Sequence, residues 1–281
     1  PPEDGDAAGQ YRYLKARCAD HGVDDPARLF ARTEFRAGEK NLPAQNNILK
    51  RTLTDWSAGA DGPARIRLHG LQELVLRKAG LGGQRNNLVK REDVLDALDC
   101  EPEDLFPADT RFVDVGAVVE RSQLSTVSEL VKGSALPVFI HADGGVGKTV
   151  FVQSLAASLN QEFEVVVFDC FGGGSYRSED QARHLPRVGL VQIANELASR
   201  GLCDPLLPGD SDRIGLAKAA RKRFDQAART VKEQSEKRGV LIILDAADNA
   251  QLEADNRKEE SFPRLLLSSL SDVPIDGLKL V

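Results

Sequence analysis

The stretch that decides the fold reads His141-Ala142-Asp143-Gly144-Gly145-Val146-Gly147-Lys148-Thr149, directly after the apolar residues 136–140. Its three glycines allow a tight turn that aims successive amide N–H groups inward, making a nest for an anion at the start of a helix. Lys148 brings a positive charge to the phosphates, and the Thr149 hydroxyl is placed to ligate Mg²⁺. The pattern predicts a phosphate-binding loop between a strand at 136–140 and a helix at 148–159, with a nucleoside triphosphate as ligand.

A second motif lies at 239–249, where an apolar run ends in Asp245 and is followed by Asp248 and Asn249. A buried parallel strand presents the residues at its carboxyl end to the edge of the sheet where α/β proteins bind ligands. We expect Asp245 to hold Mg²⁺ with Thr149, either directly or through a water, and Asp248 to orient or deprotonate the water that attacks the terminal phosphate. The predicted catalytic residues are Lys148, Asp245 and Asp248. The predicted nucleotide-binding residues are Gly144, Gly145, Val146, Gly147, Lys148, Thr149 and Val150.

With these two motifs the chain resembles the STAND class of P-loop ATPases, relatives of the NLR immune receptors. The spelling Asp-Ala-Ala-Asp-Asn at 245–249, together with residues 169–177, is most similar to bacterial antiviral (Avs-type) STAND ATPases. The usual second motif of the class ends in Glu, where this chain has Asn249. The resemblance implies ATP or ADP and Mg²⁺ as ligands, slow regulatory hydrolysis, and a homo-oligomer that forms on activation. It further implies an upstream effector and a downstream sensor in a longer chain, with a phage protein as trigger.

The segment between the motifs is expected to add a strand at 163–168 that ends at Asp169, which is a candidate strand-end cap or magnesium-linked acid. The candidates for a sensor of the terminal phosphate, or for ordinary solvated side chains, are Arg177, Arg183, His184 and Arg187. The resemblance places residues 111–113 against the adenine. A strand at 277–281 and helices at 120–132, 188–199 and 212–236 complete the expected α/β fold, a three-layer core with a parallel sheet.

The first 110 residues show a different pattern, with apolar residues at helical spacing in five segments, at 11–21, 26–35, 45–56, 63–78 and 91–98. No catalytic constellation accompanies them. We interpret 1–110 as an all-α linker or adaptor region. Residues 111–281 are interpreted as a P-loop STAND NTPase core that is incomplete at its C-terminal end.

Composition narrows the choice of partners. A net charge of −6 and a pI near 5.4 argue against a broad nucleic-acid surface, so nucleic acid is not required. The four cysteines lack metal-site spacing, and no stretch has the length and apolarity of a membrane span, so we expect a cytoplasmic protein without a membrane partner. Two functions stay open: a regulatory ATPase switch, and a nucleic-acid-linked STAND or AAA+-like regulator or motor. A GTPase is less favoured because the guanine-reading sequence Asn-Lys-x-Asp does not occur.

Overall fold

The computed structural model of the chain describes residues 16, 42–80, 88–108, 112, 121–178, 182–207, 209 and 212–281. The chain divides into two compact units, residues 1–46 and 47–281. Of the first unit, the described part contains Ala16, which is helical, and the start of helix α3 (Leu42–Trp56). Apart from Ala16, the helices predicted at 11–21 and 26–35 lie outside the described residues.

The second unit is built around a parallel sheet with strand order β1 (Phe163–Asp169), β2 (Gly239–Asp245) and β3 (Leu278–Leu280). β1 and β2 pair without offset and end side by side, at Asp169 and Asp245. Their valines, isoleucines and phenylalanines suit strands that are covered on both faces. The strands predicted at 163–168, 239–245 and 277–281 are confirmed.

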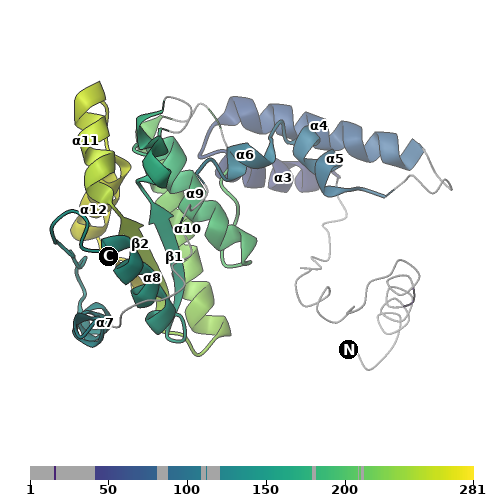
Figure 1. Cartoon of the computed structure of the whole chain (residues 1–281). Helices are drawn as coiled ribbons and strands as arrows, with labels where there is room; N and C mark the ends of the chain where they lie inside the picture. The colour runs from purple at the N-terminus through teal and green to yellow at the C-terminus, as the bar shows by residue number, and fades with distance from the viewer. Residues whose placement is uncertain are drawn as a thin grey trace. The chain divides into compact units, whose positions relative to one another are not determined.

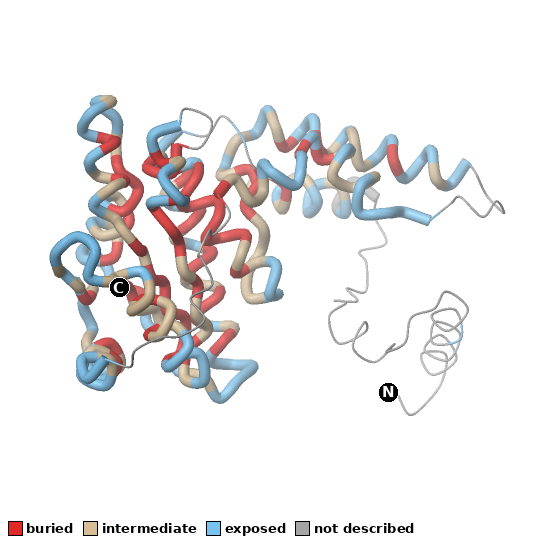
Figure 2. Tube along the Cα trace, viewed as in Figure 1, coloured by how far each residue is buried: buried red, intermediate tan, exposed pale blue. Residues whose placement is uncertain are grey.

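Helices cover both faces of the sheet and give the predicted three layers (Figure 1). One face packs against α7 (Gln123–Gly133) and α8 (Lys148–Leu159), and the other against α9 (Pro186–Ser199), α10 (Arg213–Gln234) and α12 (Phe262–Asp272). Alternation along β2 separates the two cores, because Leu241 and Ile243 face α8 whereas Val240 and Ile242 face α9 and α10. Buried residues concentrate in these layers (Figure 2).

The strand predicted at 136–140 is not a regular strand. The segment touches the edge of the sheet at β3, where the Val138 N–H donates to the Leu280 carbonyl at 2.9 Å. Pro137 has no N–H to donate to a neighbouring strand, whereas a regular strand needs a repeating series of such bonds. Leu136 and Phe139 are 64% and 76% exposed, so large apolar side chains stand in solvent beside this segment.

Among the helices described around the sheet, α11 (Ala247–Arg257) and α12 were not predicted. The sequence of α11 is rich in acids and amides and has little apolar periodicity, so its helical signal is weak. The helix expected at 148–159 matches α8 at both ends. The helices expected at 120–132, 188–199 and 212–236 correspond to α7, α9 and α10 with shifted ends.

The helical part before the sheet consists, in the described residues, of α3, α4 (Asp61–Gly80), α5 (Arg91–Ala97) and α6 (Pro102–Leu105). This confirms the helices predicted at 45–56, 63–78 and 91–98. The part has its own small core, which includes Leu53, Leu98 and, from beyond α9, Leu207. Because the Leu207 N–H also donates to the Trp56 carbonyl at 2.8 Å, α3 is joined to the sheet domain. The domain boundary at residue 110 stays a prediction.

Candidate nucleotide site

The glycine-rich loop 144–147, called the phosphate loop after the ligand that the sequence predicts for it, lies immediately before α8. Gly145 and Gly147 have φ angles of 77° and 86°, a left-handed conformation that a Cβ disfavours. Gly147 is the residue before the first turn of α8, and Lys148, Thr149 and Val150 form that turn. The unpaired amides and the dipole of the helix N-terminus favour a negatively charged ligand here.

The Lys148 ammonium is held by the loop itself. Its Nζ donates to the carbonyls of Ala142 at 2.8 Å and Asp143 at 3.0 Å. Both acceptors are neutral carbonyl oxygens, whereas a phosphate oxygen carries a negative charge and would add Coulombic attraction to the hydrogen bond. The side chain is therefore already at the loop, with neutral partners that a phosphate can replace.

Asp245, at the end of β2, is the acid that faces the phosphate loop. Burial raises the pKa of Asp245, and its hydrogen bonds from the Thr149 hydroxyl and the Ala246 N–H oppose that shift. The neighbouring carboxylates of Asp169 and Asp248 raise the pKa further. Asp245 is 4% exposed, and its Oδ2 has no hydrogen-bond partner among the described residues. A buried carboxylate oxygen without a partner is costly unless a ligand or cation satisfies it.

These residues fit a magnesium ion that is held mainly by phosphate. No group of three or more His, Cys, Asp or Glu residues within the described ranges could hold a metal by itself. Mg²⁺ in nucleotide sites commonly takes one or two protein oxygens, and phosphate oxygens and waters supply the rest. The Thr149 hydroxyl and the unpartnered Asp245 Oδ2 are the oxygens that the chain could offer to such an ion.

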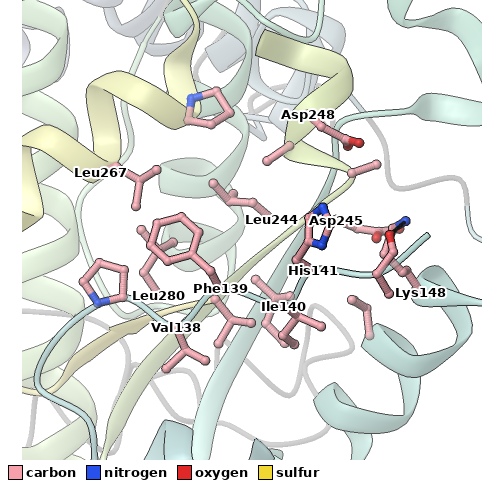
Figure 3. A pocket seen from close by; sticks show the side chains of 18 residues that line it. Val138, Phe139, Ile140, His141, Lys148, Leu244, Asp245, Asp248, Leu267 and Leu280 are labelled. Atoms are coloured by element: carbon pink, nitrogen blue, oxygen red, sulfur yellow. Dashed lines mark hydrogen bonds between the residues drawn. The ribbon is translucent and has the colours of Figure 1, made fainter. Parts of the chain in front are cut away.

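A cleft of about 270 Å³ brings the predicted catalytic residues together (Figure 3). Lys148, Asp245 and Asp248 all line it. His141, to which the sequence assigned no role, lines the same polar end. The opposite end is apolar and is formed by Val138, Phe139, Leu244, Leu267 and Leu280.

Asp248 differs from Asp245 in its surroundings. It is exposed and lies in the first turn of α11, where a carboxylate is also favoured by the helix dipole. Ala246, which follows Asp245 in the sequence, is the N-cap residue of this helix and has φ 55° and ψ 41°. An alanine in the left-handed region is strained, and such strain is typical of functional sites.

Asp169 acts as a strand-end cap. Its Oδ1 accepts hydrogen bonds from the N–H groups of Phe171 and Gly172, each at 2.9 Å. Arg183 is buried and its Nη1 donates to the Asp169 carbonyl at 2.7 Å. The structural alternative for Asp169 is therefore supported by its contacts.

The other candidate sensors have varied partners. The Nε2 atom of the buried His184 lies 2.6 Å from Glu259 Oε2. The Arg177 guanidinium lies 5.2 Å from the centre of the Tyr176 ring, and Arg187 is exposed on the first turn of α9. Thus Arg183 and His184 have buried structural contacts, and the sensor stays a prediction for Arg177 and Arg187.

Arg121 contacts the glycine-rich loop, which the sequence did not predict. Its Nη2 donates to the Val146 carbonyl at 2.5 Å and lies 3.3 Å from the position that a Cβ on Gly147 would take. A lone arginine before α7 carries no sequence signal for this contact. Of the segment expected at the adenine, Phe112 packs against the core beside α8, and Arg111 and Val113 lie outside the described residues.

Comparison with known proteins gives one family. The family model described as "Nephrocystin 3, N-terminal" matches residues 122–279, which is more than half of the chain. The match begins just before α7. It includes the glycine-rich loop, Asp169 and Asp245 at the ends of β1 and β2, and most of β3. A search of curated proteins finds no match. Neither α4 nor any other helix in the described ranges is long and apolar enough to cross a bilayer. Because the family model covers more than half of the chain, the chain belongs to the nephrocystin 3 N-terminal family, a NACHT/STAND-like region.

Proposed function

We propose that the chain is the nucleotide-dependent switch of a STAND-type signalling ATPase. One observation carries this proposal: a glycine-rich loop with Lys148 shares a cleft with Asp245 at the end of β2 and Asp248 in the first turn of α11. ATP and ADP are the proposed ligands. The amides of the loop and Lys148 would bind the phosphates, and Thr149 and Asp245 would hold Mg²⁺, which neutralises phosphate charge when bound.

Hydrolysis in this proposal is slow and resets the switch. Asp248 is the group that would orient or deprotonate the attacking water, because its carboxylate is exposed in the cleft. The usual Glu of the second motif is replaced by Asn249, a neutral side chain that cannot accept a proton at neutral pH. A motif that lacks this glutamate suits a regulatory enzyme better than one with fast turnover.

The wider setting is proposed from the resemblance to Avs-type proteins. The module would act in the cytoplasm of a bacterium, in antiviral defence. Recognition of a phage protein by a downstream sensor would drive homo-oligomerisation and activate an upstream effector. α3 supports a connection between an upstream part and the ATPase, because its Asp55 forms an ion pair at 2.9 Å with Arg223 of α10.

Calorimetry of ATP and ADP binding to the whole chain tests the proposal. We expect binding by the wild type and at least about a hundredfold weaker binding by Lys148→Ala, because charge-assisted phosphate contacts are lost. Lys218→Ala removes an exposed lysine on α10 and is the matched control, which should bind like the wild type. Equal affinities for the wild type and Lys148→Ala would overturn the proposal.

Turnover measurements separate the two functions that the sequence leaves open. A switch should hydrolyse ATP slowly and show no stimulation by DNA or RNA. Strong stimulation of turnover by nucleic acid, with no effect of nucleotide on oligomeric state, would favour the nucleic-acid-linked regulator or motor instead.

A further inference from the structure

A groove of about 730 Å³ lies between α3 and the first half of α10. None of the described residues that line it also lines the nucleotide cleft. The two helices contribute Asn47, Lys50, Arg51 and Thr54 from α3, and Gly215, Lys218, Ala219 and Lys222 from α10. In both sets the residues stand at positions i, i+3, i+4 and i+7, which lie on one face of a helix.

This basic groove is positive, although the chain has a net charge of −6. Its charged lining residues are the cations Lys50, Arg51, Lys218 and Lys222 and the acids Asp55 and Asp61. The cations therefore outnumber the acids by two to one. Positive charge that is concentrated in one groove of an acidic protein favours an anionic partner there.

The cations of the basic groove are available to a ligand. Arg51 and Lys218 are exposed, and neither forms an ion pair with a residue that the structure describes. The Lys222 Nζ lies 2.6 Å from Asp55 Oδ1, and the Lys50 Nζ lies 3.4 Å from Asp61 Oδ2. All four of these paired side chains are partly exposed, and ion pairs of this kind contribute little to stability. An incoming carboxylate can therefore replace either acid at small cost.

The lining of the basic groove favours a peptide over a nucleic acid. None of the described residues that line it is aromatic, so it offers no ring on which a base could stack. Its uncharged lining includes four small residues, Ala58, Gly59, Gly215 and Ala219. Their short side chains leave room for a peptide backbone between the cations of the two helices.

The spacing of the cations on α10 matches an extended acidic peptide. Lys218 and Lys222 are four residues apart on the helix, which is ~6 Å along its axis. Alternate residues of an extended chain point to the same side and are ~6.6 Å apart. Carboxylates at alternate positions of such a segment would therefore reach these two lysines together.

We propose that the basic groove binds a short acidic segment of a partner protein in an extended conformation. Carboxylates at alternate positions contact Lys218 and Lys222, and a further carboxylate contacts Arg51 across the groove. Because α3 and α10 both contribute, the bound segment joins the helical part to the sheet domain, in addition to the ion pair of Asp55 with Arg223. The inference does not depend on the proposed nucleotide function.

Fluorescence anisotropy of the whole chain with a labelled peptide of four Glu-Ser repeats tests the groove. The double variant Arg51→Gln, Lys218→Gln should bind the peptide about tenfold more weakly, because two exposed ion pairs with the ligand are lost. The matched control is the double variant Arg65→Gln, Arg264→Gln, which removes two exposed positive charges outside the groove and should bind like the wild type. All these substitutions are on exposed side chains, so the melting temperatures should agree.

Three results would overturn the proposal. The first is the absence of peptide binding by the wild type. The second is equal affinity of the groove variant and its control variant for the peptide. The third is tighter binding of a single-stranded oligonucleotide of the same charge than of the peptide, with the same loss in the groove variant, because the occupant would then be a nucleic acid.

Two further comparisons test the electrostatics and the extended conformation. Affinity for the peptide should fall as ionic strength rises from about 0.01 M to about 0.15 M, since the Debye length falls from about 30 Å to about 8 Å. A peptide of the same composition with the repeat Glu-Glu-Ser-Ser should bind more weakly than the alternating one. Affinity that is independent of salt contradicts the charge contacts, and equal affinity for the two peptides contradicts the extended conformation.

Limited proteolysis tests whether the bound segment joins the two parts. The alternating peptide should slow cleavage between α3 and the sheet domain in the wild type, and should have no such effect on the groove variant. If the peptide binds the wild type without slowing this cleavage, the joining role is wrong.

Discussion

Asp245→Asn should make the protein more stable while it weakens magnesium-dependent nucleotide binding. The wild-type carboxylate is 4% exposed, has an unpartnered oxygen and lies beside two further acids. Asparagine keeps the shape and the carbonyl oxygen but removes the charge. The variant still buries a polar atom at this place, but an unsatisfied buried group costs about 1–3 kcal/mol and more when it is charged, so removal of the charge should give a gain of about 1–2 kcal/mol at pH 7. For a domain of this size the melting temperature should rise by roughly 2–8 °C.

The pH dependence of this gain follows from the direction of the pKa shift. Because the pKa of Asp245 is raised in the folded protein, its protonation stabilises the fold. The wild type is therefore penalised above the folded pKa, and the penalty fades as the pH falls through that pKa toward the lower value of the unfolded chain. The stability difference between Asp245→Asn and the wild type should be largest near neutral pH and smallest in acid.

Thermal denaturation without nucleotide at several pH values provides the assay, and calorimetry with Mg-ATP measures the loss of binding. Asp248→Asn is the matched control, because it removes an exposed carboxylate in the same cleft and should leave the melting temperature nearly unchanged. The reasoning is refuted if Asp245→Asn lowers the melting temperature at pH 7. It is equally refuted if magnesium strengthens ATP binding to the variant as much as to the wild type.

Two further predictions concern the framework of the site. Gly239→Ala should destabilise the fold by about 3 kcal/mol in urea denaturation, because its Cβ would lie 1.9 Å from the Gly277 carbonyl oxygen, at a φ of 149°. Asp55→Ala should cost about 3 kcal/mol in the same assay and speed proteolysis between α3 and the sheet domain. The reason is that Arg223, whose side chain is 0% exposed, would lose its ionic partner at 2.9 Å.

Each of these changes has a control in the chain. Gly133→Ala introduces a Cβ with no heavy atom within 4 Å and should not destabilise. Asp61→Ala breaks a pair with Lys50 in which both side chains are well exposed, and should have little effect. If Gly239→Ala were as stable as Gly133→Ala, or Asp55→Ala as stable as Asp61→Ala, the packing described for these sites would be incorrect.

Much of the core was predictable because its signals are local. The glycine spacing at 144–147 requires left-handed turns that two of the glycines adopt, and the apolar run at 239–244 could form only a covered strand. That Asp245 lies at the same cleft as Lys148 was predictable for a similar reason, since strand ends in a parallel sheet meet at one edge. The prediction of a regular strand at 136–140 was wrong, because apolar periodicity does not show whether a neighbouring strand will form the repeating series of hydrogen bonds that a strand needs.

The sequence by itself determined the position of the glycine-rich loop before α8, the strands β1 and β2 and the acid at the end of β2, because each depends on residues adjacent along the chain. Only the tertiary structure decided that Arg121 contacts the loop, that Asp169 and Arg183 form a buried cap, and that Ala246 is strained. These features join segments distant in sequence or depend on a backbone angle that alanine normally avoids. The spacing of residues along the chain does not show which distant segments will bury polar or charged groups against one another.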